Sequence, residues 1–122
     1  MTAPGPDAAR SRLAGLYQAF NARDMPTLLA AMTPDVCWPN GWEGGVLHGR
    51  AEVSAYWRRQ WAEIEPSVTP TAFTEEADGR VAVSVRQVVR DKAGAKLAND
   101  TVTHVYRLVD GLVAEMEIRP RP

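Results

Sequence analysis

Residues 81–118 read VAVSVRQVVRDKAGAKLANDTVTHVYRLVDGLVAEMEI, and this stretch indicates an antiparallel sheet. Valine, threonine and tyrosine, which favour strands, dominate three runs that are divided by Ala93-Gly94 and Asp110-Gly111. Such Gly-containing pairs are typical of hairpin turns. A fourth run, residues 68–76, ends just before Asp78-Gly79. We therefore predict four consecutive antiparallel strands, at residues 68–76, 81–90, 97–109 and 112–118.

Alternation along these strands predicts which side chains point inward, because neighbouring side chains in a strand lie on opposite faces. The odd-numbered valines of residues 81–89 share one face with Gln87, and we expect this apolar face to be the inner one. The strand that holds His104 has two mixed faces. A three-residue loop at residues 109–111 would place His104 opposite Met116. That register predicts that His104 points inward.

Helical spacing dominates the first half of the chain. Apolar residues recur every three or four positions over residues 7–20 and again over residues 24–32, where Asp24 is suited to be the N-cap. An aromatic stripe predicts a third helix over residues 50–63. Between the second and third helices, residues 36–38 read as a short strand followed by a glycine-rich loop.

Helices at one end of the sequence and a meander at the other predict an α+β domain whose helices pack on one face of the sheet. The length of 122 residues suits one domain with one core. Residues 1–6 are small and rich in proline, so we expect a disordered tail there. Residues 7–122 are then a single domain.

Composition argues against several classes of function. The 14 basic and 15 acidic residues nearly cancel, so no broad positive field is available to attract nucleic acid or a membrane surface. No apolar run is long enough to cross a bilayer. One cysteine and two histidines do not supply a zinc site of the His and Cys type, and no cofactor is expected. With no disulfide and no secretory signal, we expect a cytoplasmic protein.

Three local strings, in this order of elements, resemble the nuclear transport factor two (NTF2) superfamily. They are YQAFNARD at residues 17–24, LHGR at residues 47–50 and Asp110-Gly111. That superfamily includes ketosteroid isomerases, SnoaL-like polyketide cyclases and limonene-epoxide hydrolases. The resemblance implies a cone-shaped, curved antiparallel sheet packed on three N-terminal helices and enclosing a pocket. It does not imply one activity, because this fold hosts enzymes and binding modules alike.

The catalytic set of ketosteroid isomerases is not reproduced here. By resemblance, that family's general-base aspartate falls on Asn40, and its oxyanion-hole tyrosine falls on Leu16, one position from Tyr17. Its oxyanion-hole aspartic acid falls on His104. Because an amide cannot abstract a proton at neutral pH, steroid isomerisation by that mechanism is not expected.

The limonene-epoxide hydrolase set is reproduced only in part. That family's Tyr-x-Asn pair corresponds to Trp38 and Asn40, so the asparagine is present. Its Asp-Arg-Asp machinery falls on Gln87, Val85 and Ile118, which leaves no carboxylate to activate water.

Three residues are candidates for catalysis: His104, Asn40 and Asp100. His104 can give and take a proton near neutral pH, and burial should lower its pKa. It is equally a candidate for a core histidine bonded to Gln87 or to a backbone carbonyl. Asn40 is expected to orient a ligand, or else to bond the backbone near the open end of the sheet. Asp100, the nearest counterpart of the SnoaL-like acid/base carboxylate, is otherwise expected at a solvated rim.

We also predict a set of ligand-binding residues, chosen for inward strand positions, helical spacing or an aromatic ring near the mouth: Leu16, Tyr17, Phe20, Trp38, Trp42, Tyr56, Trp57, Val85, Gln87, Val102, Tyr106, Met116 and Ile118. The same aromatic residues could instead be plain core or dimer packing.

Three functions remain open. The first is a cofactor-independent cyclase, isomerase or dehydratase acting on a small apolar or aromatic molecule, with His104 as acid/base. The second is a binding protein of the same shape without chemistry. The third is an interaction module, since members of this superfamily commonly dimerise through the outer face of the sheet, and a homodimer is expected here.

Overall fold

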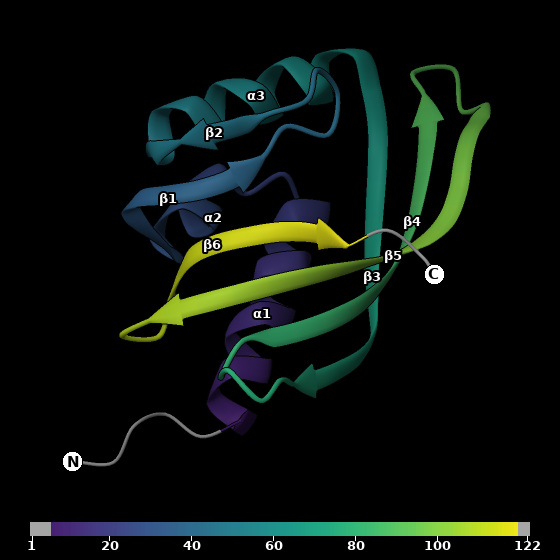
Figure 1. Ribbon diagram of the computed structural model, residues 1–122. Coiled ribbons are helices and arrows are strands. Elements are labelled where there is room, and N and C mark those ends of the chain that lie inside the picture. Colours follow the sequence, from purple (N-terminus) through teal and green to yellow (C-terminus); the bar gives the residue numbers. More distant parts are fainter. Residues whose placement is uncertain (1–5, 120–122) are drawn as a thin grey trace.

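The structure is a computed structural model and describes residues 6–119 (Figure 1). Its helices are α1 (Pro6–Asn21), α2 (Met25–Ala30) and α3 (Gly49–Glu63). Its strands are β1 (Met32–Pro39), β2 (Val46–His48), β3 (Ile64–Glu75), β4 (Val81–Asp91), β5 (Lys96–Val109) and β6 (Leu112–Arg119). Most of the predicted N-terminal tail, residues 1–5, lies outside the described residues.

The six strands form one curved sheet in the order β2-β1-β6-β5-β4-β3, and α1 lies across its inner face (Figure 1). The predicted meander is present as β3 to β6, with every neighbouring pair antiparallel. The pair β1 and β6 differs from the antiparallel expectation because it is parallel. A parallel pair requires a long crossover, and α3 with the meander supplies it. The α+β architecture with N-terminal helices is therefore confirmed.

The last hairpin corrects the predicted register. Asp110 and Gly111 both have positive φ, 52° and 79°, which defines a two-residue turn of the I′ type and not a three-residue loop. An extra residue, Ala114, then shifts the register of β6 between its pairs with Leu108 and Arg107. His104 therefore lies opposite Ile118 and not opposite Met116. Each change moves the register by one residue, so together they return His104 to the inner face.

Local signals account for most element boundaries. The Asp24 carboxylate accepts a hydrogen bond from the Thr27 amide, as expected of the N-cap of α2. Several boundaries differ from the prediction. Strand β1 runs from Met32 to Pro39, although residues 36–38 were predicted and residue 32 was assigned to the second helix. The three-residue strand β2 was not expected within the loop that precedes α3, and β3 starts at Ile64, directly after α3, although residue 68 was predicted.

The core fills the space between the helices and the inner face of the sheet. Leu13 of α1, Val53 of α3, and Val83 and Val85 of β4 are completely buried. Burying one such side chain contributes about 1.5–3 kcal/mol, so these contacts fix α1 and α3 against the sheet. The curvature that results leaves a cavity beside the core.

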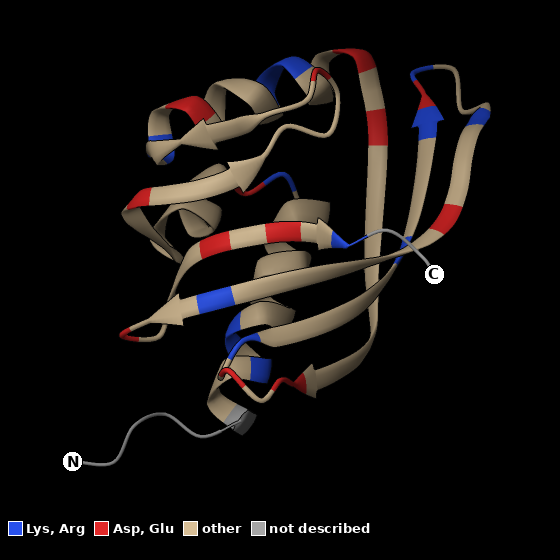
Figure 2. Cartoon of the chain, viewed as in Figure 1, with Lys and Arg blue, Asp and Glu red and all other residues tan. Residues whose placement is uncertain are grey.

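Acidic and basic residues are interspersed along the chain (Figure 2). Several of them pair across the strands, as Arg80 does with Glu117, at 2.8 Å. Opposite charges at such short range leave little net field over this part of the surface. None of the helices within residues 6–119 is long and apolar enough to cross a membrane.

Candidate functional site

A cavity of about 290 Å³ lies between the helices and the inner face of the sheet. Its wall is formed by Leu16, Tyr17, Phe20, Leu28, Trp38, Pro39, Gly41, Trp42, Tyr56, Trp57, Gln60, Ile64, Val68, Gln87, Val89, Ala98, Val102, His104, Tyr106, Met116 and Ile118. Within the described part of the chain, this wall contains no Asp, Glu, Lys or Arg. A molecule inside would therefore meet apolar surface and a small number of neutral polar groups.

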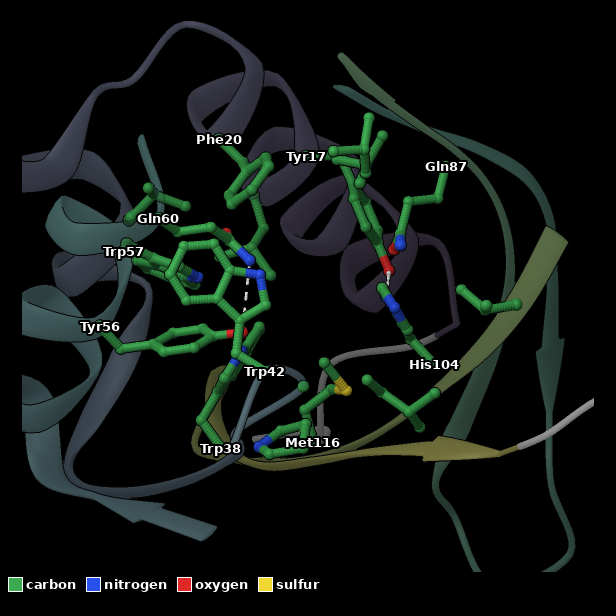
Figure 3. A pocket seen from close by; sticks show the side chains of 18 of the residues that line it. Tyr17, Phe20, Trp38, Trp42, Tyr56, Trp57, Gln60, Gln87, His104 and Met116 are labelled. Atoms are coloured by element: carbon green, nitrogen blue, oxygen red, sulfur yellow. Dashed lines mark hydrogen bonds between the residues drawn. The ribbon is translucent and has the colours of Figure 1, made fainter. Parts of the chain in front are cut away.

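One end of the cavity carries a chain of three hydrogen-bonded side chains. Figure 3 shows the bond between two of them, Tyr17 and His104. The Tyr106 hydroxyl donates to the Tyr17 hydroxyl at 2.7 Å. The Tyr17 oxygen lies 2.9 Å from Nδ1 of His104. Two elements create the cluster: Tyr17 lies on α1, and His104 and Tyr106 are alternate residues of β5, so both point inward.

The order of these bonds is compatible with one tautomer of the imidazole that leaves a donor facing the cavity. If the Tyr17 oxygen accepts from Tyr106, its own hydrogen is available to Nδ1 of His104. In that tautomer Nδ1 accepts, and the proton of the neutral ring is on Nε2. Among the described residues, no side chain or backbone group is hydrogen-bonded to that Nε2–H. The ring thus offers one free donor at the cavity wall.

Burial keeps the three groups neutral. His104 is 7% exposed, and desolvation lowers its pKa from 6.5 to about 4. Desolvation likewise raises the pKa values of the Tyr17 and Tyr106 hydroxyls far above the usual value of 10. At neutral pH the cluster is therefore a set of uncharged donors and acceptors.

Aromatic rings form the adjoining wall. The rings of Trp38 and Trp57 meet edge to face at 5.3 Å, and Phe20 packs against Trp57 at 5.7 Å. The ring of Trp61 stacks on that of Trp57, with 6.1 Å between the ring centroids. Trp42 is 41% exposed and sits over Tyr56 at 6.2 Å. Such rings suit a flat, apolar ligand.

A second polar pair lies on α3. Gln60 Nε2 donates to the Tyr56 hydroxyl at 3.3 Å, an interaction between residues one helical turn apart. Tyr56 is 4% exposed. Burial raises the pKa of Tyr56, while hydrogen bonds from the Gly41 amide and Gln60 oppose that rise. The hydroxyl therefore keeps its proton at neutral pH.

Comparison with known proteins identifies the family. The sequence profile of the SnoaL-like domain matches residues 13–116. The chain belongs to the SnoaL-like family. No curated protein matches this SnoaL-like protein in sequence.

Solved structures agree on the fold. An NTF2-like protein of unknown function from Burkholderia pseudomallei K96243 is 30% identical, with a TM-score of 0.80 over 93% of this chain and 91% of that one. TerC, co-crystallised with polyporic acid, is 26% identical, with a TM-score of 0.80 over 93% and 92%. Rv0760c from Mycobacterium tuberculosis, in complex with estradiol-17β-hemisuccinate, is 19% identical, with a TM-score of 0.80 over 93% and 94%.

Most of the predicted ligand-binding residues of this SnoaL-like protein lie in the cavity wall, and so does His104. Val85 does not, because it is completely buried in the core. The bonding partner of His104 is Tyr17, although Gln87 or a backbone carbonyl was the expected partner if the histidine belonged to the core.

Two residues predicted to be catalytic lie outside the cavity wall. The Asn40 side-chain oxygen accepts from the backbone amides of Trp42 and Glu43, so it shapes its own turn and does not face a ligand. Asp100 is exposed on β5, at the solvated rim named as its alternative place. Neither residue belongs to the cavity wall, although Asp100 lies directly opposite the wall residue Gln87 in the sheet.

Several wall residues were not predicted from the sequence, among them Gln60, Ile64 and Val68. Gln60 was overlooked because only aromatic and aliphatic residues were followed along α3, although it lies one turn after Tyr56. Ile64 and Val68 were assigned to a helix end and a strand start without an inner face, since the true start of β3 was missed. The i to i+4 spacing was the available signal for Gln60.

Proposed function

We propose that this SnoaL-like protein binds a small, neutral, largely apolar molecule in its cavity and holds one oxygen atom of that molecule with Nε2–H of His104. The observation that carries the proposal is the bond between Tyr17 and His104. In the tautomer with Nδ1 accepting from Tyr17, Nε2–H is a donor at one end of a cavity whose wall is mostly apolar. The binding of polyporic acid by TerC, a relative at 26% identity, supports a small-molecule ligand.

We further propose that His104 acts as a neutral electrophile in a cofactor-independent isomerisation, cyclisation or dehydration. A neutral imidazole can polarise a carbonyl and stabilise the oxyanion that develops from it. One such donor contributes about 3–4 kcal/mol of transition-state stabilisation. The Tyr106 to Tyr17 to His104 chain aligns three dipoles toward that oxygen, which strengthens the last bond.

Under this proposal His104 keeps only part of the acid/base role expected from the sequence: it donates a hydrogen bond but does not act as a general base. A His104 pKa of about 4 disfavours the imidazolium that a general base must form. Full transfer of a proton out of the chain would leave a buried phenolate, and desolvation raises the pKa values of both tyrosines against that outcome. His104 is therefore proposed to donate a hydrogen bond, while the substrate keeps or moves its own proton.

A second candidate function is binding without chemistry. It is favoured by one observation: no carboxylate lines the cavity wall within residues 6–119 to move a proton on carbon. In this alternative, the same His104 donor selects an oxygen-bearing ligand and lowers no barrier. The two functions share the binding step and differ only in turnover.

Nitrogen-15 NMR of the imidazole, with and without 2-naphthol, a neutral two-ring probe, tests the shared step. We expect a neutral ring with the proton on Nε2 in the free protein, and a shift of Nε2 larger than that of Nδ1 when the ligand binds. His104→Leu should weaken binding, whereas Arg58→Ala, on the exposed face of α3, should not. A proton on Nδ1, or binding that is unaffected by His104→Leu, would contradict the proposal.

A further inference from the structure

The Tyr56 hydroxyl is a buried donor without an acceptor. Its oxygen already receives a hydrogen bond from Gln60 at 3.3 Å, so its own hydrogen points elsewhere. Among the described residues, no group accepts that hydrogen. Tyr56, Gln60 and Gly41 all line the cavity, so an acceptor on a bound molecule could pair with this hydrogen.

The donors of His104 and Tyr56 lie on opposite sides of the cavity. Figure 3 shows Tyr56 and Gln60 on one side and the Tyr17–His104 pair on the other, with Trp38 and Met116 between them. The donor at each end is neutral, and the surface between them is apolar. This arrangement matches a flat molecule that has an oxygen at each end and a hydrocarbon body.

The volume of the cavity limits the size of the ligand's hydrocarbon body. An apolar cavity of about 150 Å³ accommodates benzene, so about 290 Å³ corresponds to roughly two fused rings. The uncharged wall also limits the ligand's charge, because a carboxylate or ammonium would lose its hydration without gaining an ion pair.

We propose that the ligand of this site is a neutral two-ring molecule with an acceptor oxygen at each end, one bound by His104 and the other by Tyr56. Tyr56 is then a specificity-determining residue, and Gln60 positions its hydroxyl. The proposal rests on the proposed function for the His104 end. It adds the second end and the class of molecule that spans both.

Isothermal titration with three matched probes tests the proposal. Naphthalene has no oxygen, 2-naphthol has one, and 2,6-dihydroxynaphthalene has one at each end. A neutral hydrogen bond is worth about 0.5–1.5 kcal/mol, or roughly two- to twelvefold in affinity. We expect the affinity of the intact protein to rise by such a factor with the first hydroxyl and again with the second.

Variants of the protein show which end of the cavity is responsible for each gain in affinity. Tyr56→Phe should remove the gain from the second hydroxyl and leave the affinity for 2-naphthol unchanged. Arg58→Ala, on the exposed face of the same helix, should keep the gain from both hydroxyls. Gln60→Leu, like Tyr56→Phe, should reduce the gain in affinity from the second hydroxyl. It tests the same end of the cavity if Tyr56→Phe folds poorly.

The outcomes separate the two proposals. If 2-naphthol binds no more tightly than naphthalene, the proposed function of His104 fails. If 2-naphthol binds more tightly but the second hydroxyl adds nothing, only the role of Tyr56 fails. Equal losses for 2-naphthol and 2,6-dihydroxynaphthalene in both Tyr56→Phe and Gln60→Leu would mean that Tyr56 contributes packing alone, and would also overturn the inference.

Discussion

The Tyr17 hydroxyl holds two partners at once, and the polar end of the cavity depends on it. It accepts from Tyr106 and donates to His104, so no other residue in the cluster can replace it. Removing it leaves a buried donor and a buried acceptor unpaired together. We therefore expect the loss of the central hydroxyl, that of Tyr17, to lower the stability of the protein more than the loss of a group at either end of the cluster.

Tyr17→Phe should destabilise the protein more than Tyr106→Phe does. The first variant orphans the Tyr106 hydroxyl and Nδ1 of His104, at about 1–3 kcal/mol for each group left unpaired. The second removes one bond but leaves Tyr17 paired with His104. Urea unfolding of the two variants measures the difference. Equal losses would show that the three groups are not bonded in this order.

The stability of the fold should depend on pH through His104. Its pKa is about 4 in the folded protein and about 6.5 in the unfolded chain, so the unfolded chain binds the extra proton between these values. Stability from this group is complete above pH 6.5 and is lost as the pH falls toward 4. At about 1.4 kcal/mol per pH unit, the loss reaches roughly 3 kcal/mol.

His104→Gln is the control for that dependence, because glutamine does not titrate. Unfolding free energies at pH 7, 5.5 and 4.5 should fall more steeply for the wild type than for the variant. Parallel curves for the two proteins would contradict the lowered pKa. The carboxylates Glu65, Glu76 and Asp78 also have lowered pKa values, but they are common to both proteins and cancel in the comparison.

At this scale the sequence allowed part of the site to be predicted. Strand alternation was enough to place Gln87 on the inner face, whereas His104 was placed there through a loop length that proved wrong and an extra residue in β6 that compensated for it. The Tyr17 to His104 bond was not predictable, because 87 positions separate the two residues and no local pattern links them. Asn40 was misassigned because an asparagine serves a turn as readily as a ligand, and only the backbone amides of the folded loop distinguish the two.

Among the elements, α3 supplies Tyr56, Trp57 and Gln60 to the cavity wall from its inner face. Trp57 is 3% exposed and contacts Trp38 and Phe20, whereas its neighbour Arg58 is exposed. The helix is thus held to the sheet by one face only.

Trp57→Ala should therefore cost about 3–5 kcal/mol of stability, against about 0.5 kcal/mol or less for Arg58→Ala. Thermal melting of both variants provides the measurement. Similar melting temperatures would mean that the two residues share one environment, and the orientation of α3 would be wrong.

Element boundaries were predictable where turns carry a strong local signal. The Gly residues at 79, 94 and 111 all adopt positive φ, and each ends a strand of the meander as predicted. Strand β2 was missed because three residues between a glycine-rich loop and a helix have no periodicity to detect. The register of β6 was wrong because the extra residue at Ala114 depends on pairing and not on the local sequence.

For the whole molecule, the packing of α1 on the inner face leaves the outer face of the sheet open to a second copy (Figure 1). The partly exposed residues predicted for that face are small or semi-polar: Ala82, Ser84, Val88, Thr101 and Thr103. Val105, which was predicted with them, is buried at 1% exposure.

We expect a homodimer through this face. Light scattering at micromolar concentration should give twice the mass of 13.4 kDa. Thr103→Arg, which adds a bulky charge to the centre of the face, should produce monomers, while Arg58→Ala on α3 should not. A monomer in the wild-type protein at this concentration would count against the prediction.

The contact of Trp38, Trp57 and Trp61 also has an optical consequence. Indole rings 5.3 and 6.1 Å apart share their excited states, so light absorbed by any of them migrates among all three before emission. Trp38 and Trp57 line the cavity, and Trp42 lies at its edge. A molecule entering beside one ring should therefore quench the whole group and change its circular dichroism. The protein carries its own spectroscopic reporter of occupancy, and no label is needed to watch the cavity fill.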